Sequence, residues 1–515
     1  KEDYLMGINF SRVLTLRYGN SVSNYLKTKY QAISVGRVMT CVLGMVVRRE
    51  REIRSFVKTP FYRVLGSISL EGENFDGEWR AVEGSRYFRS PYLYKENGFK
   101  EKQYAEKLIG ELSQNSPLVC QVEKIERKKE NKNPPLLFNL AELQNVCSRL
   151  FKISPDETLR IVQELYEKKL VTYPRTDARV LSTAVAKEIY KNISGLRRYP
   201  QIDGAADEVL EMGTYKNIAK TRYVNDKQIT DHYAIIPTGQ GLSALNGISL
   251  TAQRVYETIV RRFLCIFYPP AVYQKVNLVT VMEKEHFFSS FRVLQSEGYL
   301  KIAANSFAAK KTSEKSQDSE EEENTSCNEV LLAALQKLKK NDILSVDSLS
   351  IKEGETSPPK RYNSGSMILA MENAGQLIED EELRAQIRGS GIGTSATRAE
   401  ILKKLFSIKY LSLNKKTQVI TPTLLGEMIF DVVNCSIRQL LNPELTASWE
   451  KGLTYVAEGS ITPQEYMDKL EHFVRVRTVQ VEQSNYQYAL RQFFDAAAEN
   501  YKKKPSASKR GGKEL

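Results

Sequence analysis

The chain has 515 residues and a formal net charge of +13, and 41% of its residues are hydrophobic. This length exceeds what one compact core supports, so several domains are expected. No stretch approaches the roughly 18 uninterrupted apolar residues of a membrane span, which excludes a transmembrane protein and makes a cytoplasmic location the default. The basic balance favours a polyanionic partner whose binding weakens with salt.

The N-terminal part is predicted to be helical. Residues 1–12 have the pattern of a helix, and a long amphipathic helix follows residues 34–39. A Ser and a Gly before a helix start can present free backbone N–H groups to a phosphate, and Arg37 adds positive charge. A capped helix with a solvated basic end explains the same pattern equally well.

Two distant segments have the alternating pattern of β-strands. They are residues 61–70 and residues 272–281, and turn glycines follow the first of them. We expect these two strands to pair with each other in one β-domain that the residues between them interrupt.

The interrupting part is predicted to be helical. Asn139 can cap one helix, and residues 154–157 form a capping box with proline at the first position of the next helix. The extended residues 170–173 follow. Two short helices and a strand predict a helix-turn-helix unit with Tyr173 at the exit of the strand.

Residues 171–179 combine a phenol, two guanidiniums, two threonine hydroxyls and a carboxylate. Tyr173 is a weak nucleophile at neutral pH because a phenol has an ordinary pKa of ~10. Arg175 can offset this weakness, since a guanidinium favours the phenolate and can bind non-bridging phosphate oxygens. The segment therefore suits attack on a phosphodiester. Because the chain has 27 tyrosines, a tyrosine that merely packs in a core stays open as an alternative.

The chain has only three histidines, which argues against a metal site or a nuclease built from histidines. His232 has a polar approach and an apolar strand behind it. A lone histidine can be purely structural. If His232 lies near Tyr173, its cation can hold a phosphate or relay a proton.

A loop rich in glycine and hydroxyl groups, residues 391–400, opens a helix in the C-terminal half. Strand patterns follow at residues 410–413 and 417–421. The order repeats that around Tyr173 and predicts a second winged-helix unit with a phosphate-binding helix N-terminus. Ser, Thr and Gly also occur at helix starts for capping alone.

Two segments have no apolar periodicity. Residues 303–328 carry an acidic run and are expected to form a disordered surface loop, with an acidic mimic of DNA as the alternative. Residues 501–515 are rich in lysine and are expected to form a flexible basic tail for nonspecific phosphate contact.

Six segments, in the same order, resemble the type IA DNA topoisomerases, closest to the bacterial topoisomerase III-like branch. Six ordered segments are more specific than any one of them. They are residues 3–12, 34–38, 134–140, 173–177, 232–238 and 391–394, with the sequences DYLMGINFSR, SVGRV, PPLLFNL, YPRTD, HYAIIPT and GIGT.

The resemblance implies that Tyr173 cuts one DNA strand and holds its 5′ phosphate as a phosphotyrosine. Arg175 would stabilise the scissile phosphate, and His232 would be the active-site histidine. The covalent bond stores the energy of the broken phosphodiester, so no ATP is expected. The substrate would be single-stranded or negatively supercoiled DNA. The residues expected to line the single-strand groove are Asp3, Arg12, Ser34, Val35, Gly36, Arg37, Val38, Met39, Thr394, Thr397 and Arg398.

The fold implied by the resemblance is a multidomain α+β torus with winged-helix units and a β-rich arch that lifts the tyrosine domain to open a gate. The protein is expected to be a monomer near the nucleoid, without a membrane partner. The expected parts are a groove domain at 1–58 and 361–500, an arch at 59–130 and 266–360, the Tyr173 domain at 131–265, and the tail.

The sequence departs from the family pattern in three ways. Ala178 stands where the family usually has Ser, and Met39 stands where it usually has Gln, so each position loses a polar contact. The family's N-terminal TOPRIM domain, with its catalytic Glu, Lys and Mg²⁺-binding acids, has no counterpart, and the acidic run at 380–382 does not replace it. We therefore expect no metal ligands in this chain, Mg²⁺ in the absent domain, and an N-terminally incomplete enzyme.

Two other classes of protein were weighed against this interpretation. A non-catalytic single-strand-binding scaffold would share the groove without the TOPRIM domain. A tyrosine recombinase or a relaxase would share the nucleophile, but the first needs an Arg-His-Arg constellation and the second a histidine cluster. Three scattered histidines disfavour both.

Overall fold

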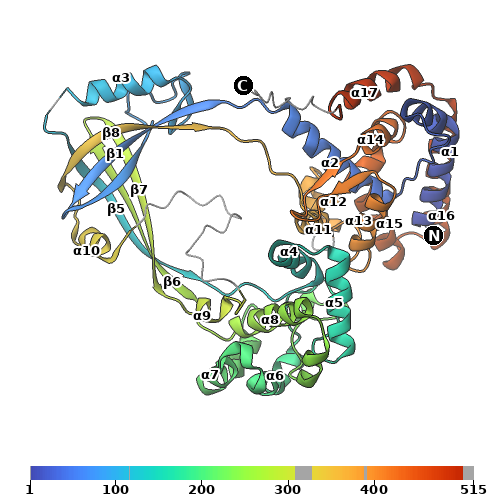
Figure 1. Cartoon of the computed structure of the whole chain (residues 1–515), viewed down its shortest axis with the longest axis horizontal. Coiled ribbons are helices and arrows are strands. Elements are labelled where there is room, and N and C mark those ends of the chain that lie inside the picture. The colour runs from blue at the N-terminus through green and yellow to red at the C-terminus, as the bar shows by residue number, and fades with distance from the viewer. Residues whose placement is uncertain (1, 115, 308–326, 388–390, 503–515) are drawn as a thin grey trace, which may run out of the picture.

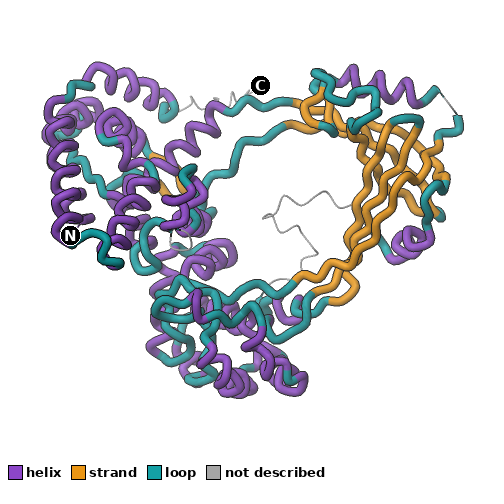
Figure 2. The backbone as a smooth tube through the Cα atoms, turned by 180° about the vertical axis from the view of Figure 1, so that it is seen from behind, coloured by secondary structure: helices purple, strands orange, loops and turns teal. Residues whose placement is uncertain are grey.

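A computed structural model describes residues 2–114, 116–307, 327–387 and 391–502 of the chain. Their buried side chains gather in three separate hydrophobic cores, and the three parts of the chain around these cores form a ring (Figure 1, Figure 2). We call the parts the terminal unit (2–59, 356–387 and 391–502), the middle unit (133–270 and 297–307) and the barrel unit (60–114, 116–132, 271–296 and 327–355).

The terminal unit is mostly helical and contains both ends of the described chain. Its first two helices pack against helices from the C-terminal third, for example α1 against α16 and α2 against α14. A two-stranded antiparallel sheet follows α13. Its elements are α1 (Glu2–Leu26), α2 (Arg37–Ser55), α11 (Ser364–Glu372), η6 (Ala374–Leu377), α12 (Glu381–Gln386), α13 (Arg398–Ser407), β9 (Leu411–Leu413), β10 (Ile420–Pro422), α14 (Leu424–Ser436), η7 (Arg438–Leu441), α15 (Pro443–Ala457), α16 (Pro463–Gln483) and α17 (Gln487–Glu499).

The middle unit is also helical. The cap predicted at Asn139 forms there, but the capping box predicted at residues 154–157 forms only in part, because the Glu157 carboxylate accepts hydrogen bonds from Arg160. The Asn139 side chain accepts a hydrogen bond from Glu142 N, and the Ser154 side chain accepts one from Glu157 N. Its elements are α4 (Leu140–Phe151), α5 (Pro155–Glu167), α6 (Thr183–Gly195), η1 (Leu196–Arg198), η2 (Pro200–Ile202), α7 (Ala205–Met212), η3 (Thr214–Lys220), η4 (Asp226–Gln228), η5 (Leu242–Gly247), α8 (Leu250–Cys265) and α9 (Leu300–Ala303).

The barrel unit is an antiparallel sheet that closes on itself, in the order β2-β7-β6-β5-β8-β1 and back to β2. Closure leaves no open edge among these six strands. Both strands predicted from the alternating pattern, β1 and β6, lie in this sheet but are not neighbours. The elements are β1 (Pro60–Leu70), β2 (Glu73–Arg80), β3 (Leu93–Lys95), β4 (Gly98–Phe99), α3 (Lys102–Leu112), β5 (Val119–Lys132), β6 (Ala271–Met282), β7 (Glu285–Ser296), α10 (Glu329–Lys337) and β8 (Ile343–Glu355).

Covalent connections close two sides of the ring and packing closes the third. The barrel unit continues into the terminal unit at both β1 and β8, and into the middle unit at β5 and β6 (Figure 1). The middle and terminal units meet where α4 packs against α11. The ring can therefore open at this contact without a break in the chain.

The strand predicted at residues 170–173 is wrong. The structure has only an isolated bridge between Val171 and Pro237. A proline has no N–H to donate, so the ladder does not extend here. Within the described residues, the first predicted helix-turn-helix unit therefore has two helices, α4 and α5, but no strand behind them.

The predicted acidic loop and tail fall mostly outside the described residues, at 308–326 and 503–515. At their described ends the predictions need correction. Ala303 ends α9 instead of starting a loop. Tyr501, the first residue of the predicted tail, is folded onto the terminal unit because a buried carboxylate accepts its hydroxyl hydrogen.

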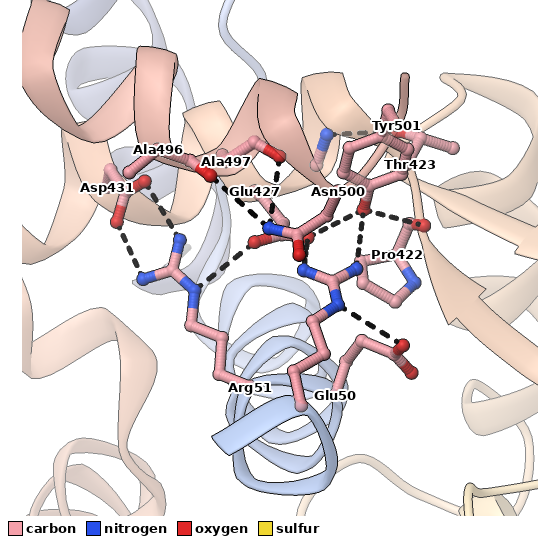
Figure 3. Close-up of polar contacts among 12 residues, drawn as sticks. Glu50, Arg51, Pro422, Thr423, Glu427, Asp431, Ala496, Ala497, Asn500 and Tyr501 are labelled. Atoms are coloured by element: carbon pink, nitrogen blue, oxygen red, sulfur yellow. Dashed lines mark hydrogen bonds and ion pairs between the residues drawn. The ribbon is translucent and has the colours of Figure 1, made fainter. Parts of the chain in front are cut away.

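A polar cluster between α2, α14 and the end of α17 holds Tyr501 (Figure 3). The Tyr501 hydroxyl donates to Glu427 at 2.6 Å, and Arg54 donates to the same carboxylate at 2.6 Å. Arg51 forms a two-pronged ion pair with Asp431, both N–O distances being 2.9 Å. Because both buried carboxylates are paired, the cluster fastens α2 to α14 without an uncompensated charge.

Among the described residues, none of the helices combines the length and apolar character needed to cross a bilayer.

Candidate functional site

The Tyr173 loop, residues 170–178, is fixed on one side by the segment that carries His232. The N–H of Thr172 donates to the carbonyl of Ile236 at 3.0 Å. The Thr176 hydroxyl donates to the His232 carbonyl at 2.8 Å. Two segments that are distant in the chain are therefore held side by side by backbone carbonyls.

This arrangement brings Tyr173 and His232 together. Their ring centroids lie 4.4 Å apart with the planes tilted by 42°. Tyr166 of α5 meets the Tyr173 ring edge-on at 5.5 Å. The tyrosine is half-buried and the histidine is exposed, so the pair lies at the surface of the middle unit. His232 therefore lies beside Tyr173, as its functional interpretation requires.

Arg175 extends from the same loop and is exposed. Among the described residues, no hydrogen bond or ion pair holds its guanidinium. An arginine without a protein partner keeps all its donors for a phosphate. Its placement two residues after Tyr173 agrees with the predicted role, which stays a prediction.

The other side of the Tyr173 loop contacts the terminal unit. Arg398, only 1% exposed, pairs with Asp177 at 3.0 Å between guanidinium Nη1 and carboxylate Oδ1. The amide Nδ2 of Asn139 donates to the Glu372 carboxylate at 2.6 Å and to the Asp177 carbonyl at 3.1 Å. Thus Arg398, predicted to contact DNA, contacts the loop that carries Tyr173.

Burial governs the charge on Glu372. Removal from water raises the pKa of this carboxyl, while Arg398 and the Asn139 amide lower it and Asp177 raises it. Burial has the largest effect, so the closed interface favours the protonated carboxyl more than water does.

The start of α2 has the open backbone predicted for phosphate binding. Gly36 is the N-cap residue, its backbone is extended, and no side chain caps the helix. A Cβ added at Gly36 would meet nothing within 4 Å. Ser34 is half-buried and its N–H donates to the hydroxyl of Tyr410 at 2.9 Å, whereas the neighbouring side chains of Val35, Val38 and Met39 are buried.

Arg37 does not extend toward solvent. It is 8% exposed, and its guanidinium pairs with Glu2 at 3.1 Å, Asp3 at 2.9 Å and Glu450 at 3.1 Å. The ion pairs join α1, α2 and α15. Two residues predicted to contact DNA, Asp3 and Arg37, therefore contact each other. Arg12 is exposed on α1.

The loop before α13 exposes two hydroxyls. Thr394 and Thr397 are exposed, and the Thr397 hydroxyl accepts the Thr394 N–H at 3.0 Å. Gly391 has a positive φ of 67°, and a Cβ there would lie 2.2 Å from the carbonyl oxygen of Met371. Only glycine fits this approach, which places the loop against the end of α11.

Sequence reasoning missed two residues of this arrangement. Asn139 was identified only as a helix cap, and Glu372 was not singled out. A helix cap with spare amide donors and an acid at a helix end are too common to signal an interface.

The described side chains lack the grouping of ligands that a metal ion needs. In the described part of the chain, no group of three His, Cys, Asp or Glu side chains can hold a metal ion. The side chains around Tyr173 therefore do not form a Mg²⁺ site on their own.

Comparison with known proteins identifies the family. A model of the DNA topoisomerase family matches residues 1–468. The chain belongs to the type IA DNA topoisomerases. DNA topoisomerase 3 of Bacillus licheniformis is 30% identical over 491 residues, and that of Bacillus subtilis is 29% identical over 488 residues. The resemblance seen in the six segments is confirmed.

The fold of this type IA chain agrees with that assignment. The structure of full-length topoisomerase I from Thermotoga maritima matches it with a TM-score of 0.62 at 21% identity, over 94% of this chain and 68% of that one. The two Bacillus relatives align with 94% of this chain, which spans 60% of the length of each.

Proposed function

We propose that the protein acts as a DNA topoisomerase that cuts one DNA strand with Tyr173, passes another strand through the break and reseals it without ATP. The observation that carries the proposal is the contact between Tyr173 and His232, 4.4 Å between ring centroids, in a chain of this family.

The reaction is a transesterification. The Tyr173 oxygen attacks the phosphorus, a bond to the 5′ phosphate forms, and the bond to the 3′ oxygen breaks with its electron pair. The phenol proton leaves Tyr173 and a proton reaches the 3′ oxygen. Arg175 balances charge on the phosphate oxygens, and His232 holds the phosphate or relays a proton. Attack by the 3′ hydroxyl reverses the step, so the bond energy is kept.

The groove for the DNA strand lies on the terminal unit. The uncapped start of α2 at Gly36 offers backbone N–H groups, and Thr394 and Thr397 offer hydroxyls beside Arg398. Helix α13 with the β9–β10 pair serves as a winged-helix unit that supports this loop. Single-stranded or negatively supercoiled DNA is the substrate, and the protein acts as a monomer at the nucleoid.

The three units are the domains of the proposed mechanism, divided near residues 59, 132, 270 and 355, with residues 297–307 in the middle unit. The barrel unit is the arch, and the contact between α4 and α11 is the gate. We expect a TOPRIM domain to hold Mg²⁺. Among the described residues, no group of three His, Cys, Asp or Glu side chains could hold a metal ion.

The test uses the longest natural form of the protein that contains these residues, called here the full-length protein, with a single-stranded oligonucleotide labelled at one end. Cleavage through a 5′ phosphotyrosine leaves a 3′ label on the protein and releases a 5′ label. Tyr173→Phe is expected to abolish the adduct and the relaxation of negatively supercoiled plasmid. Tyr166→Phe, which keeps a ring beside Tyr173, is the matched control and should form the adduct.

Three results would contradict the proposal in different ways. Adducts that persist in Tyr173→Phe overturn the assignment of the nucleophile. A 5′ label on the protein indicates recombinase-type chemistry. Tight binding of single strands by a full-length protein that forms no adduct supports the scaffold.

A further inference from the structure

The Tyr173 loop is held by both sides of the gate. On the middle unit, Thr172 and Thr176 bond to the carbonyls of Ile236 and His232. On the other side, the contact runs to the terminal unit through Asp177. When the two units separate, the loop keeps its hydrogen bonds to the middle unit but loses its contact with the terminal unit.

Four side chains make the contact beside the Tyr173 loop. Arg398 pairs with the Asp177 carboxylate at 3.0 Å, and Asn139 donates to Glu372 at 2.6 Å. Asn139 also donates to the Asp177 carbonyl at 3.1 Å, so the two contacts meet at one residue of the loop. Asn139, which is 1% exposed, has both amide donors engaged at once.

The surrounding interface is close and polar. A Cβ added at Gly365 of α11 would lie 2.7 Å from the Cα of Asn145 in α4. The hydroxyls of Ser148 and Ser364 lie 3.0 Å apart, and Gln418 donates to the Lys152 carbonyl at 3.0 Å. Polar interfaces of this kind separate more readily than apolar ones, because water can satisfy the freed groups.

We infer that Asn139 and Glu372 are positioning residues. With the Asp177–Arg398 ion pair they form a latch that aligns the Tyr173 loop only when the gate is closed. The inference rests on the proposed function of Tyr173. In the open ring Asp177 and Asn139 leave with the middle unit, the loop loses one of its two anchors, and the nucleophile is out of alignment until the units meet again. Because small misplacements of a reacting group lower rates strongly, the latch couples chemistry to closure.

Three variants distinguish the loss of the latch from a general loss of stability. Asn139→Ser keeps a helix-capping oxygen but removes both amide donors. Glu372→Ala removes the acceptor, whereas Glu372→Gln keeps an acceptor oxygen at the same reach. In the full-length protein, the rate of adduct formation on an oligonucleotide should fall about tenfold in Asn139→Ser and Glu372→Ala, and less than about threefold in Glu372→Gln. The affinity for the oligonucleotide should stay nearly constant.

The matched control is Lys403→Gln. Lys403 of α13 pairs with Asp156 of α5 at 3.2 Å, so this variant also breaks an ion pair between the two units but leaves the Tyr173 loop untouched. Its adduct rate should equal that of the wild type.

Hydrogen exchange of the peptide that covers residues 170–180 gives a readout without activity. Exchange should be faster in Asn139→Ser and Glu372→Ala and unchanged in Lys403→Gln. Normal exchange and normal adduct rates in the first two variants overturn the latch. Faster exchange in them, combined with a wild type that forms no adduct, keeps the latch and overturns the proposed function instead.

Discussion

Glu372 illustrates how one half-buried carboxyl can report on the contact between the middle and terminal units. It lies at the end of α11 and shares the interface with Arg398, Asp177 and Arg179, all of which act on its charge. Arg398 and Arg179 favour the carboxylate, and Asp177 and burial disfavour it. Since burial dominates, the pKa of Glu372 in the folded protein lies above its ordinary value of 4.5.

The sign of the pH effect follows from this shift. A raised pKa means that the folded state holds the proton more tightly than the unfolded state. The contribution of Glu372 to stability is then fully present below pH 4.5 and is lost as the pH rises through the folded-state pKa. Glu372→Gln cannot lose this proton, so its melting temperature should rise relative to the wild type over that range, by on the order of a few degrees.

Thermal unfolding from pH 4.5 to pH 8 measures this difference. A gap between variant and wild type that stays constant over the range would mean that Glu372 titrates normally.

The two ends of helix α2 differ in their contacts. Its C-terminal half is fastened by the ion pairs of Arg51 and Arg54 with α14 (Figure 3). Glu50 also accepts two hydrogen bonds from Arg361, at 2.6 and 2.8 Å. Its N-terminal end at Gly36 has no side-chain cap. The helix therefore holds an open helix start rigidly on the terminal unit.

Gly36→Asp tests this helix start. The backbone at Gly36 is extended and has room for a side chain, and Asp is a favourable cap, so the melting temperature should stay equal or rise. A carboxylate there repels a phosphate, so the affinity for single-stranded DNA should fall about tenfold.

Gly36→Asn has the same size and capping ability without the charge. It should lose clearly less affinity than Gly36→Asp. Equal affinity for DNA in both variants would place the phosphate elsewhere.

The ring as a whole is closed by one non-covalent contact. The barrel unit connects to both other units through the chain, so separation of α4 from α11 would open the ring without a break in the chain (Figure 1). Ser148 and Ser364 face each other there with their hydroxyl oxygens 3.0 Å apart.

A disulfide across this contact should lock the ring. The double variant Ser148→Cys with Ser364→Cys places two thiols at a distance that a small adjustment can bridge. When oxidised, the full-length variant should still form the covalent adduct on an oligonucleotide but lose nearly all relaxation of supercoiled plasmid, and reduction should restore it. Each single cysteine variant is the control. Relaxation at the wild-type rate by protein with a proven disulfide would place the gate elsewhere.

Much of this organisation was predictable from local chemistry. The caps at Asn139 and Ser154 formed because hydroxyl and amide oxygens at helix starts satisfy backbone N–H groups. The alternating residues 61–70 and 272–281 became barrel strands because one face of each is buried. The six ordered segments identified the family. The strand at residues 170–173 failed because its partner segment contains a proline.

The sequence alone thus determined the family, several helices, two of the barrel strands and the segment that carries Tyr173, because these depend on neighbouring residues and on ordered motifs. Only the tertiary structure decided that His232 lies against Tyr173, that Arg37 is occupied by three carboxylates, and that Arg398 pairs with Asp177 across the gate. These contacts join residues far apart in the chain. A local sequence pattern does not specify such pairs, because they form only when packing brings a charged side chain of one unit against a polar group of another.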